Sequence, residues 1–198
     1  MVCENCHKEN RSIAKFCKWC GQPLAAQDML DKLVGLDEVK RQLKTIVDTY
    51  TYLRSRKDIA NVRISVNAVI IGETGTGKTA LAEILRDYFY KHKIIEKPKL
   101  TMVDAVDYQR FVDKWDDNIK KAKNGILFFD NVQKLLPDKY SNQVNPLDKL
   151  FVEMDKWEDN PIVIISGLNK GLEDFLESIP AVANRFKYTF RMTTPGYQ

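Results

Sequence analysis

A glycine-rich segment early in the chain has the spacing of a phosphate-binding loop. The segment GETGTGKT runs from Gly72 to Thr79 and matches the pattern GxxxxGK[ST] at every fixed position. An apolar run precedes it and apolar residues at helical spacing follow it, which is the strand–loop–helix context that the pattern requires. Glycines let successive backbone N–H groups point inward around a phosphate, and the following helix N-terminus adds partial positive charge. The alternative is a chance match in an ordinary glycine turn, which the flanking strand and helix disfavour.

Side chains at the end of this segment would complete a nucleotide site. We expect Lys78 to reach the β- and γ-phosphates of ATP and Thr79 to offer its hydroxyl to Mg²⁺. A second magnesium ligand should close another buried strand, and GILFFDN supplies Asp130 directly after an apolar run. The residues expected to bind ATP and Mg²⁺ are therefore Gly72, Glu73, Thr74, Gly75, Thr76, Gly77, Lys78, Thr79, Ala80 and Asp130.

The cysteines form a second candidate site at the N-terminus. Cys3 and Cys6 make one CxxC pair, and Cys17 and Cys20 make another. Two such turns can enclose a tetrahedral Zn²⁺, and clustered thiols in a reducing compartment are more often metal ligands than disulfides. The segment between the pairs is too short for a core, so the metal must supply most of this module's folding free energy. The alternatives are a redox pair or accidental thiols, with His7 as a rival ligand.

The elements that must position these residues predict a P-loop α/β domain with a doubly wound parallel sheet. Strands are expected at 68–71, 126–129 and 162–166. Helical segments such as 146–157 alternate with them, and a further helix begins near Asp37, its expected N-cap. Ligands of such a sheet bind just beyond the carboxyl ends of the strands, where Gly72, Asp130 and Asn169 lie.

Composition supports two modules and argues against several function classes. The 198 residues, 44% of them hydrophobic, suit a zinc ribbon over 1–25 and an α/β domain over 26–198. The net charge of +4, from 31 basic and 27 acidic residues, does not concentrate into a nucleic-acid-binding face. The polar N-terminus MVCENCHKEN does not resemble a signal peptide, and no apolar run is long enough to cross a membrane. We therefore predict a cytoplasmic protein.

The order of these parts resembles that of AAA+ ATPases, most closely the branch of the red-type rubisco activases and a related sporulation ATPase. Four stretches carry the resemblance: LVGLDEVKRQLK, GETGTGKTALA, NGILFFDNVQKL, and LEDFLESIPAVANRF with KYTF after it. The first three are generic to AAA+ proteins and the last is the most specific to the branch. The N-terminal segment is similar to zinc ribbons that usually serve as interaction modules. The resemblance implies a homo-oligomeric ring that remodels a protein partner.

The resemblance also implies roles for single residues. Asn169 would sense the γ-phosphate at the end of the fourth strand. Arg185 would be an arginine finger that reaches the nucleotide of a neighbouring subunit. The backbone near Val34 and Gly35 would contact adenine. The catalytic set expected from motif and resemblance together is Lys78, Asp130, Asn131, Asn169 and Arg185.

The chain departs from the family pattern in three places. Asn131 stands where the family has a glutamate that polarises the attacking water, and an amide cannot take up a proton at neutral pH. ATP binding should survive, while hydrolysis should be slow unless another carboxylate substitutes. The pore aromatic would be Tyr108 or Phe111, but the usual glycine after it is missing and both could be core residues. The chain also stops after the expected fifth strand, without the helical lid, which favours truncation over a naturally minimal domain.

Three functional hypotheses remain. The leading one is an ATP-driven remodelling or switching ATPase that recruits its partner through the ribbon. The second is an ATP-binding switch or scaffold that does not hydrolyse, suggested by Asn131 and the missing lid. The third, which we do not favour, is nucleic-acid binding by the ribbon through phosphate contacts and base stacking, with the candidates Lys8, Arg11, Lys15, Lys18 and Trp19.

Overall fold

The structure is a computed structural model. It describes residues 2–3, 5–11, 16–22, 30, 33, 35–56, 65–136, 147–157, 160–178 and 184–193, apart from the side chains of residues 169, 170, 175 and 178. The expected domain boundary near residue 26 and the linker around it lie outside these ranges.

A parallel sheet of five strands forms the centre of the fold, in the order β2-β3-β4-β1-β5. The strands are β1 (Ala68–Gly72), β2 (Leu100–Asp104), β3 (Ile126–Asp130), β4 (Ile162–Gly167) and β5 (Tyr188–Met192). Every neighbouring pair is parallel, so all carboxyl ends meet at one edge of the sheet. Strand β2 was not foreseen, and its register sets Asp104 beside Asp130.

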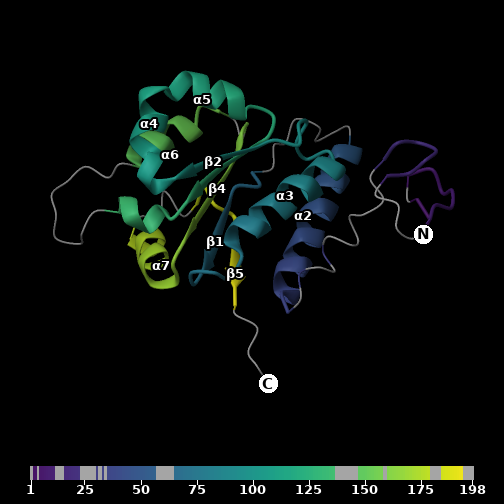
Figure 1. The fold of residues 1–198 in the computed structure, drawn as a ribbon, viewed down its shortest axis with the longest axis horizontal. Helices are drawn as coiled ribbons and strands as arrows, with labels where there is room; N and C mark the ends of the chain where they lie inside the picture. Colours follow the sequence, from purple (N-terminus) through teal and green to yellow (C-terminus); the bar gives the residue numbers. More distant parts are fainter. Residues whose placement is uncertain are drawn as a thin grey trace.

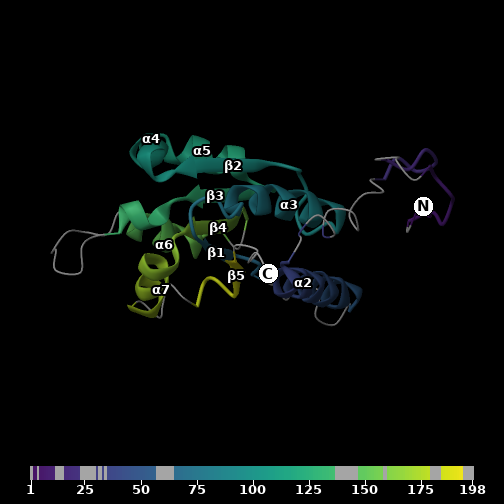
Figure 2. The same cartoon turned by 60° about the horizontal axis from the view of Figure 1, so that its bottom comes forward.

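Helices cover both faces of the sheet, as a doubly wound fold requires. Helices α2 (Asp37–Ser55) and α3 (Lys78–Lys91) pack on one face. Helices on the other face are α4 (Tyr108–Asp113), α5 (Trp115–Ala122), α6 (Asp148–Met154) and α7 (Asn169–Ser178). Figures 1 and 2 show these two groups on opposite sides of the strands. The predicted α/β fold class is therefore confirmed, with two short 3-10 turns, η2 (Ala105–Asp107) and η3 (Val132–Leu135), after β2 and β3.

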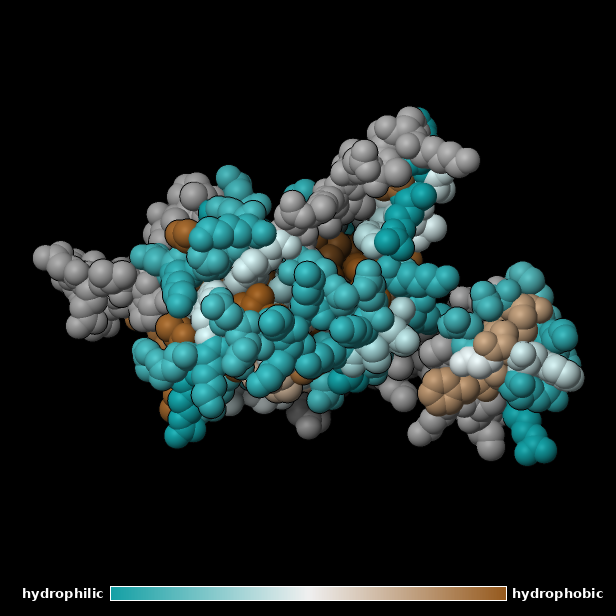
Figure 3. Space-filling view, turned by 90° about the horizontal axis from the view of Figure 1, so that it is seen from above, coloured by the Kyte–Doolittle hydropathy of each residue, from teal (hydrophilic) through white to brown (hydrophobic). Residues whose placement is uncertain are grey.

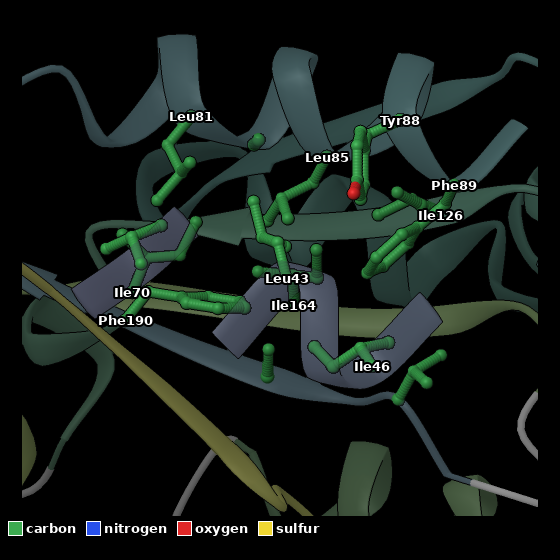
Figure 4. Packing of buried hydrophobic residues seen from close by; sticks show 14 of the residues in the cluster. Leu43, Ile46, Ile70, Leu81, Leu85, Tyr88, Phe89, Ile126, Ile164 and Phe190 are labelled. Atoms are coloured by element: carbon green, nitrogen blue, oxygen red, sulfur yellow. The ribbon is translucent and has the colours of Figure 1, made fainter. Parts of the chain in front are cut away.

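Alternating side chains of the buried strands divide the core into two layers. Ile70 of β1 points toward α2 and α3, whereas its neighbour Val69 points toward the other helix group. Figure 4 shows the first layer, where Leu43 of α2 and Leu85 of α3 meet Ile70 and Ile164. Strands buried on both faces are expected to read as continuous apolar runs, which is why β1, β3 and β4 were visible in the sequence.

The helices differ from the prediction at the N-cap of α2, and their lengths bear on whether any of them could cross a membrane. Leu36 occupies the N-cap position of α2 without a side-chain capping hydrogen bond, and Asp37, which we expected there, is the first helical residue. Within the described ranges, none of the helices has both the length and the apolar character needed to cross a membrane. The space-filling view from above is mostly hydrophilic over the main domain (Figure 3).

Candidate nucleotide-binding site

The loop between β1 and α3 depends on glycine at three positions. Gly75 and Gly77 have φ values of 82° and 87°, in the left-handed region that L side chains rarely adopt. Gly72 has a different requirement, because a Cβ there would lie 2.7 Å from Met192 Cβ and 2.7 Å from Thr76 Oγ1. The chain thus folds tightly over residues 72–77 and opens directly into α3, whose N-cap is Gly77.

Lys78 lies against this loop. Its side chain is buried, and Nζ donates hydrogen bonds of 2.9 Å to the carbonyl oxygens of Gly72 and Glu73. An ammonium has three donors, so these two bonds leave one N–H for another acceptor. The lysine therefore stands at the helix N-terminus with a donor that a phosphate oxygen could engage.

Asp130 lies at the end of β3 and accepts hydrogen bonds from three neighbours. Thr79 Oγ1 donates to Asp130 Oδ2 at 3.2 Å, and the backbone N–H of Asn131 donates to Oδ1 at 2.9 Å. The fully buried Ser166 hydroxyl also donates to Oδ1. The hydroxyl and carboxylate predicted to bind Mg²⁺ are therefore adjacent, although they lie far apart in sequence. Oxygen ligands of this kind fit a magnesium ion.

Two polar residues of this strand edge were missed by sequence reasoning. Ser166 is the penultimate residue of the apolar strand β4, and a polar residue after a buried run is its only signal in the sequence. Asp104 ends β2 in the stretch LTMVD, which has the same final residue as ILFFD in β3. Because β2 is a half-buried edge strand, its sequence is less apolar than those of the central strands, and it was not recognised as a strand from the sequence.

Asn131 joins these two strand ends. It adopts a left-handed backbone conformation with φ 58°, and its Nδ2 donates to Asp104 Oδ2 at 2.7 Å. Asp104 Oδ1 accepts from the backbone N–H of Val106 at 3.0 Å. The Val106 N–H, and after it the Asn131 amide and the charge of Lys134, hold the pKa of the Asp104 carboxyl below its ordinary value. Asp104 is therefore ionised at neutral pH.

Arg185 forms an ion pair within its own chain. Its Nε and Nη2 donate to Asp155 Oδ1 and Oδ2 at 2.9 and 2.6 Å, a bidentate pair. The guanidinium lowers the pKa of the Asp155 carboxyl. The backbone of Asn169 begins α7 just after β4, but its side chain and the whole of Val34 lie outside the described residues. Gly35 is described and has a left-handed φ of 72°.

The pore assignment of Tyr108 or Phe111 is wrong. Both side chains are buried in the core layer beneath α4, with only 4% and 5% of their surface exposed. Their rings pack edge-on against Phe129 at centroid distances of 5.9 and 5.3 Å. Burial raises the pKa of Tyr108 to about 12. The alternative of two core residues, which the sequence left open, is the one the structure supports.

The four cysteines converge at the N-terminus. Their sulfur atoms all lie within 4.8 Å of one another, with 3.6 Å between Cys3 and Cys20 and 3.5 Å between Cys6 and Cys17. A tetrahedron with Zn–S bonds of about 2.3 Å has edges of about 3.8 Å, so the spacing fits zinc. His7 is not a member of the cluster, in the part of the chain that the structure describes.

The two cysteine pairs are built alike. The backbone N–H of Cys3 donates to Lys8 O and that of Cys17 donates to Gln22 O, so each pair opens an equivalent turn. Burial opposes ionisation of Cys17, but N–H donors of Trp19, Cys20 and Asn10 outweigh it and lower the pKa of this thiol to about 6. Thiolate is the form that binds metal.

A parallel sheet with a glycine loop between β1 and α3, and a carboxylate beside the loop at the end of β3, defines a P-loop α/β domain. Residues 68–193 match the family model described as "ATPase family associated with various cellular activities (AAA)". The chain belongs to this family.

Curated relatives are distant and longer. The chain is 27% identical over 173 residues to the ESX-1 secretion system protein EccA1 of Mycolicibacterium smegmatis. This alignment covers 81% of this chain and 30% of that protein. It is 25% identical over 166 residues to the stage V sporulation protein K of Bacillus subtilis, covering 79% of this chain and 51% of that protein. The chain thus spans at most about half the length of these relatives.

A solved structure shows the same fold. The structure of the HORMA:CdnC:Trip13 complex of E. coli MS115-1 contains a chain that matches with a TM-score of 0.54 and 19% identity. The match covers 86% of this chain and 67% of that chain. At this identity the likeness supports the fold alone.

Proposed function

We propose that this protein binds ATP with Mg²⁺ and uses the state of the nucleotide to remodel or switch a protein partner. The observation that carries the proposal is the contact between Thr79 of the glycine loop and Asp130 of β3, at 3.2 Å. It supports the proposal because it brings together the hydroxyl and the carboxylate that would bind Mg²⁺, beside the loop lysine. Membership of the AAA family and relatives named for secretion and sporulation favour a protein partner over a small-molecule substrate.

The finer assignments extend this proposal. We place the chain in the branch of the rubisco activases and the sporulation ATPase, and in a homo-oligomeric ring where Arg185 acts on a neighbour's nucleotide. In the described chain Arg185 is paired with Asp155, so reaching a neighbour requires that this pair opens or shifts. The cytoplasmic location and Asn169 as a sensor of the γ-phosphate stay predictions.

The N-terminal module would hold Zn²⁺ through Cys3, Cys6, Cys17 and Cys20 and recruit the partner. Its exposed apolar side chains support recruitment, because Phe16 and Trp19 are 62% and 56% exposed. The ammonium groups of Lys8 and Lys18 each lie 4.6 Å from the centre of the Trp19 ring. Such contacts occupy ring surface that a stacked base would need, so nucleic-acid binding remains the less favoured alternative.

Isothermal titration with ATP and Mg²⁺ tests the proposal directly. We expect saturable binding, and we expect Lys78→Ala to weaken it by about tenfold or more, because charge-assisted hydrogen bonds contribute about 1.5–3 kcal/mol each. Lys120→Ala, an exposed lysine on α5 across the sheet, is the matched control and should bind like the wild type. Absence of binding in the wild type, or equal binding by Lys78→Ala, would remove the proposal.

A further inference from the structure

The ends of β2 and β3 bring a carboxylate to the place where the family glutamate is missing. Asp104 is the last residue of β2 and lies in register with Asp130, the residue before Asn131. The Asn131 amide donates to the Asp104 carboxylate at 2.7 Å. The asparagine therefore points at a carboxylate from the neighbouring strand, and the two side chains form one polar unit beside the candidate magnesium ligand.

The backbone at Asn131 favours this pairing. A left-handed conformation is uncommon for residues other than glycine, and asparagine tolerates it better than most. The same residue donates its backbone N–H to Asp130 Oδ1 at 2.9 Å. Asn131 thus holds Asp130 with its main chain and Asp104 with its side chain, which sets the two carboxylates at fixed positions on either side of it.

Asp104 keeps capacity to accept a proton from water. An ionised carboxylate has about four acceptor sites, and the two hydrogen bonds described for Asp104 use one on each oxygen. Its side chain is also half-buried, so that solvent reaches it from the strand edge where ligands of such sheets bind. Asn131 cannot take this role, because an amide is not a usable base.

Resting on the proposed ATPase function, we propose that Asp104 is the catalytic carboxylate that polarises the attacking water and that Asn131 is its positioning residue. In this arrangement the carboxylate lies at the end of β2 and the amide follows the end of β3. The chain would hydrolyse ATP without the family glutamate.

The step balances without any further reactant. The water oxygen forms a bond to the γ-phosphorus as the bond from that phosphorus to the β,γ-bridging oxygen breaks. The bridging oxygen keeps the electron pair and leaves as part of ADP, and the water proton passes to an Asp104 oxygen and then to solvent. Nothing is oxidised or reduced.

Turnover and binding measured on the same variants test the proposal. Asp104→Asn should lower ATP turnover about 10²–10⁴-fold, the usual contribution of a general base, while ATP affinity stays within about threefold. Asn at this position can still accept the Val106 N–H, so melting temperature should change little. Asp113→Asn removes an exposed carboxylate on α4 and is the matched control, with turnover unchanged.

Two further variants separate a catalytic from a structural role. The double variant Asp104→Asn/Asn131→Asp carries its carboxylate after β3 instead of at the end of β2. Its ATP turnover should be at least about tenfold higher than that of Asp104→Asn alone. The exchange also restores a hydrogen bond between an amide and a carboxylate, so the melting temperature of each variant separates the roles. A structural role predicts a fall in melting temperature in Asp104→Asn that the exchange reverses, whereas a catalytic role predicts loss and recovery of turnover at an unchanged melting temperature. Asn131→Glu adds a second negative charge beside Asp104 and should raise wild-type turnover less than about twofold; a large gain would mean that a carboxylate was missing and would overturn the proposal.

The outcomes for the proposed function and for this inference are distinguishable. Turnover by Asp104→Asn within about twofold of the wild type overturns the role of Asp104 while ATP binding stands. A wild type that binds ATP but never hydrolyses it, at any protein concentration, overturns the role as well and supports the alternative of a switch or scaffold. A wild type that binds no ATP removes both.

Discussion

At the residue scale, the candidate site is organised by hydrogen bonds to one carboxylate and by glycines that leave no room for a side chain. Asp130 is held by donors from α3, β4 and its own strand end, so its orientation is determined before any cation arrives. The loop beside it approaches β5 so closely that Gly72 has backbone and side-chain atoms of Met192 within 3 Å of where a Cβ would stand.

The close approach at Gly72 makes a testable prediction. Gly72→Ala should lower the free energy of unfolding by about 1–3 kcal/mol, because the added methyl meets the Met192 carbonyl oxygen at 2.9 Å and backbone cannot easily move away. Urea unfolding measures this. Gly171→Ala in α7 is the control, since its nearest neighbour would be at 3.6 Å and alanine suits a helix. Equal stability of Gly72→Ala and wild type would contradict the described packing.

At the element scale, one ion pair links helix α6 to the segment that leads into β5. Asp155 follows the last residue of α6, and Arg185 precedes β5. The Arg185 side chain is 23% exposed and the Asp155 side chain 61% exposed, so solvent screens the pair. This contact therefore positions Arg185 more than it stabilises the fold.

The pH dependence of this pair follows from the lowered pKa of Asp155. A carboxyl whose folded pKa is depressed contributes stability above its unfolded pKa of about 3.9 and loses it as pH falls through the folded value. Asp155→Asn should therefore cost less than about 1 kcal/mol at neutral pH, and the difference from wild type should shrink as pH falls below the unfolded pKa and vanish below the folded pKa of Asp155. Urea unfolding at several pH values, with Asp113→Asn as the control, measures it; a difference that grows on acidification would contradict the pair.

At the scale of the whole molecule, we expect two modules that are stabilised by different physical means. The α/β domain has two large apolar layers on either side of its sheet, and neither layer includes a described residue of the N-terminal module. That module instead has four converging thiols and several exposed apolar side chains. If the thiols hold Zn²⁺ as proposed, the short length of this segment makes metal binding the expected main source of its folding free energy.

Metal removal should therefore separate the modules. We expect one Zn²⁺ per chain, and we expect a strong chelator or Cys17→Ser to release it and to unfold residues 2–22 alone. Hydrogen exchange should rise there and stay unchanged over 65–136, and ATP affinity should be retained because the nucleotide site draws on no residue of the cysteine module. Lys78→Ala is the reciprocal control, with zinc retained and ATP affinity lowered. Loss of protection in β1 or β3 on chelation would contradict independent modules.

The amino-acid sequence alone was sufficient for features that local patterns determine. The glycine loop is visible because its backbone conformations demand glycine at fixed spacing, and strands β1 and β3 are visible because both faces are buried and their residues are continuously apolar. The paired cysteines likewise follow from turn geometry. Family membership and the α/β fold class could be predicted from these patterns for the same reason.

Only the tertiary structure decided which distant residues become neighbours. Strand register sets Asp104 beside Asn131, and no local pattern specifies register between segments that far apart. Apolar periodicity could not tell whether Tyr108 was a pore residue or a core residue, since either would be aromatic at that position. The partner of Arg185 was equally hidden, because an ion pair between two surface segments depends on how the whole chain folds back on itself.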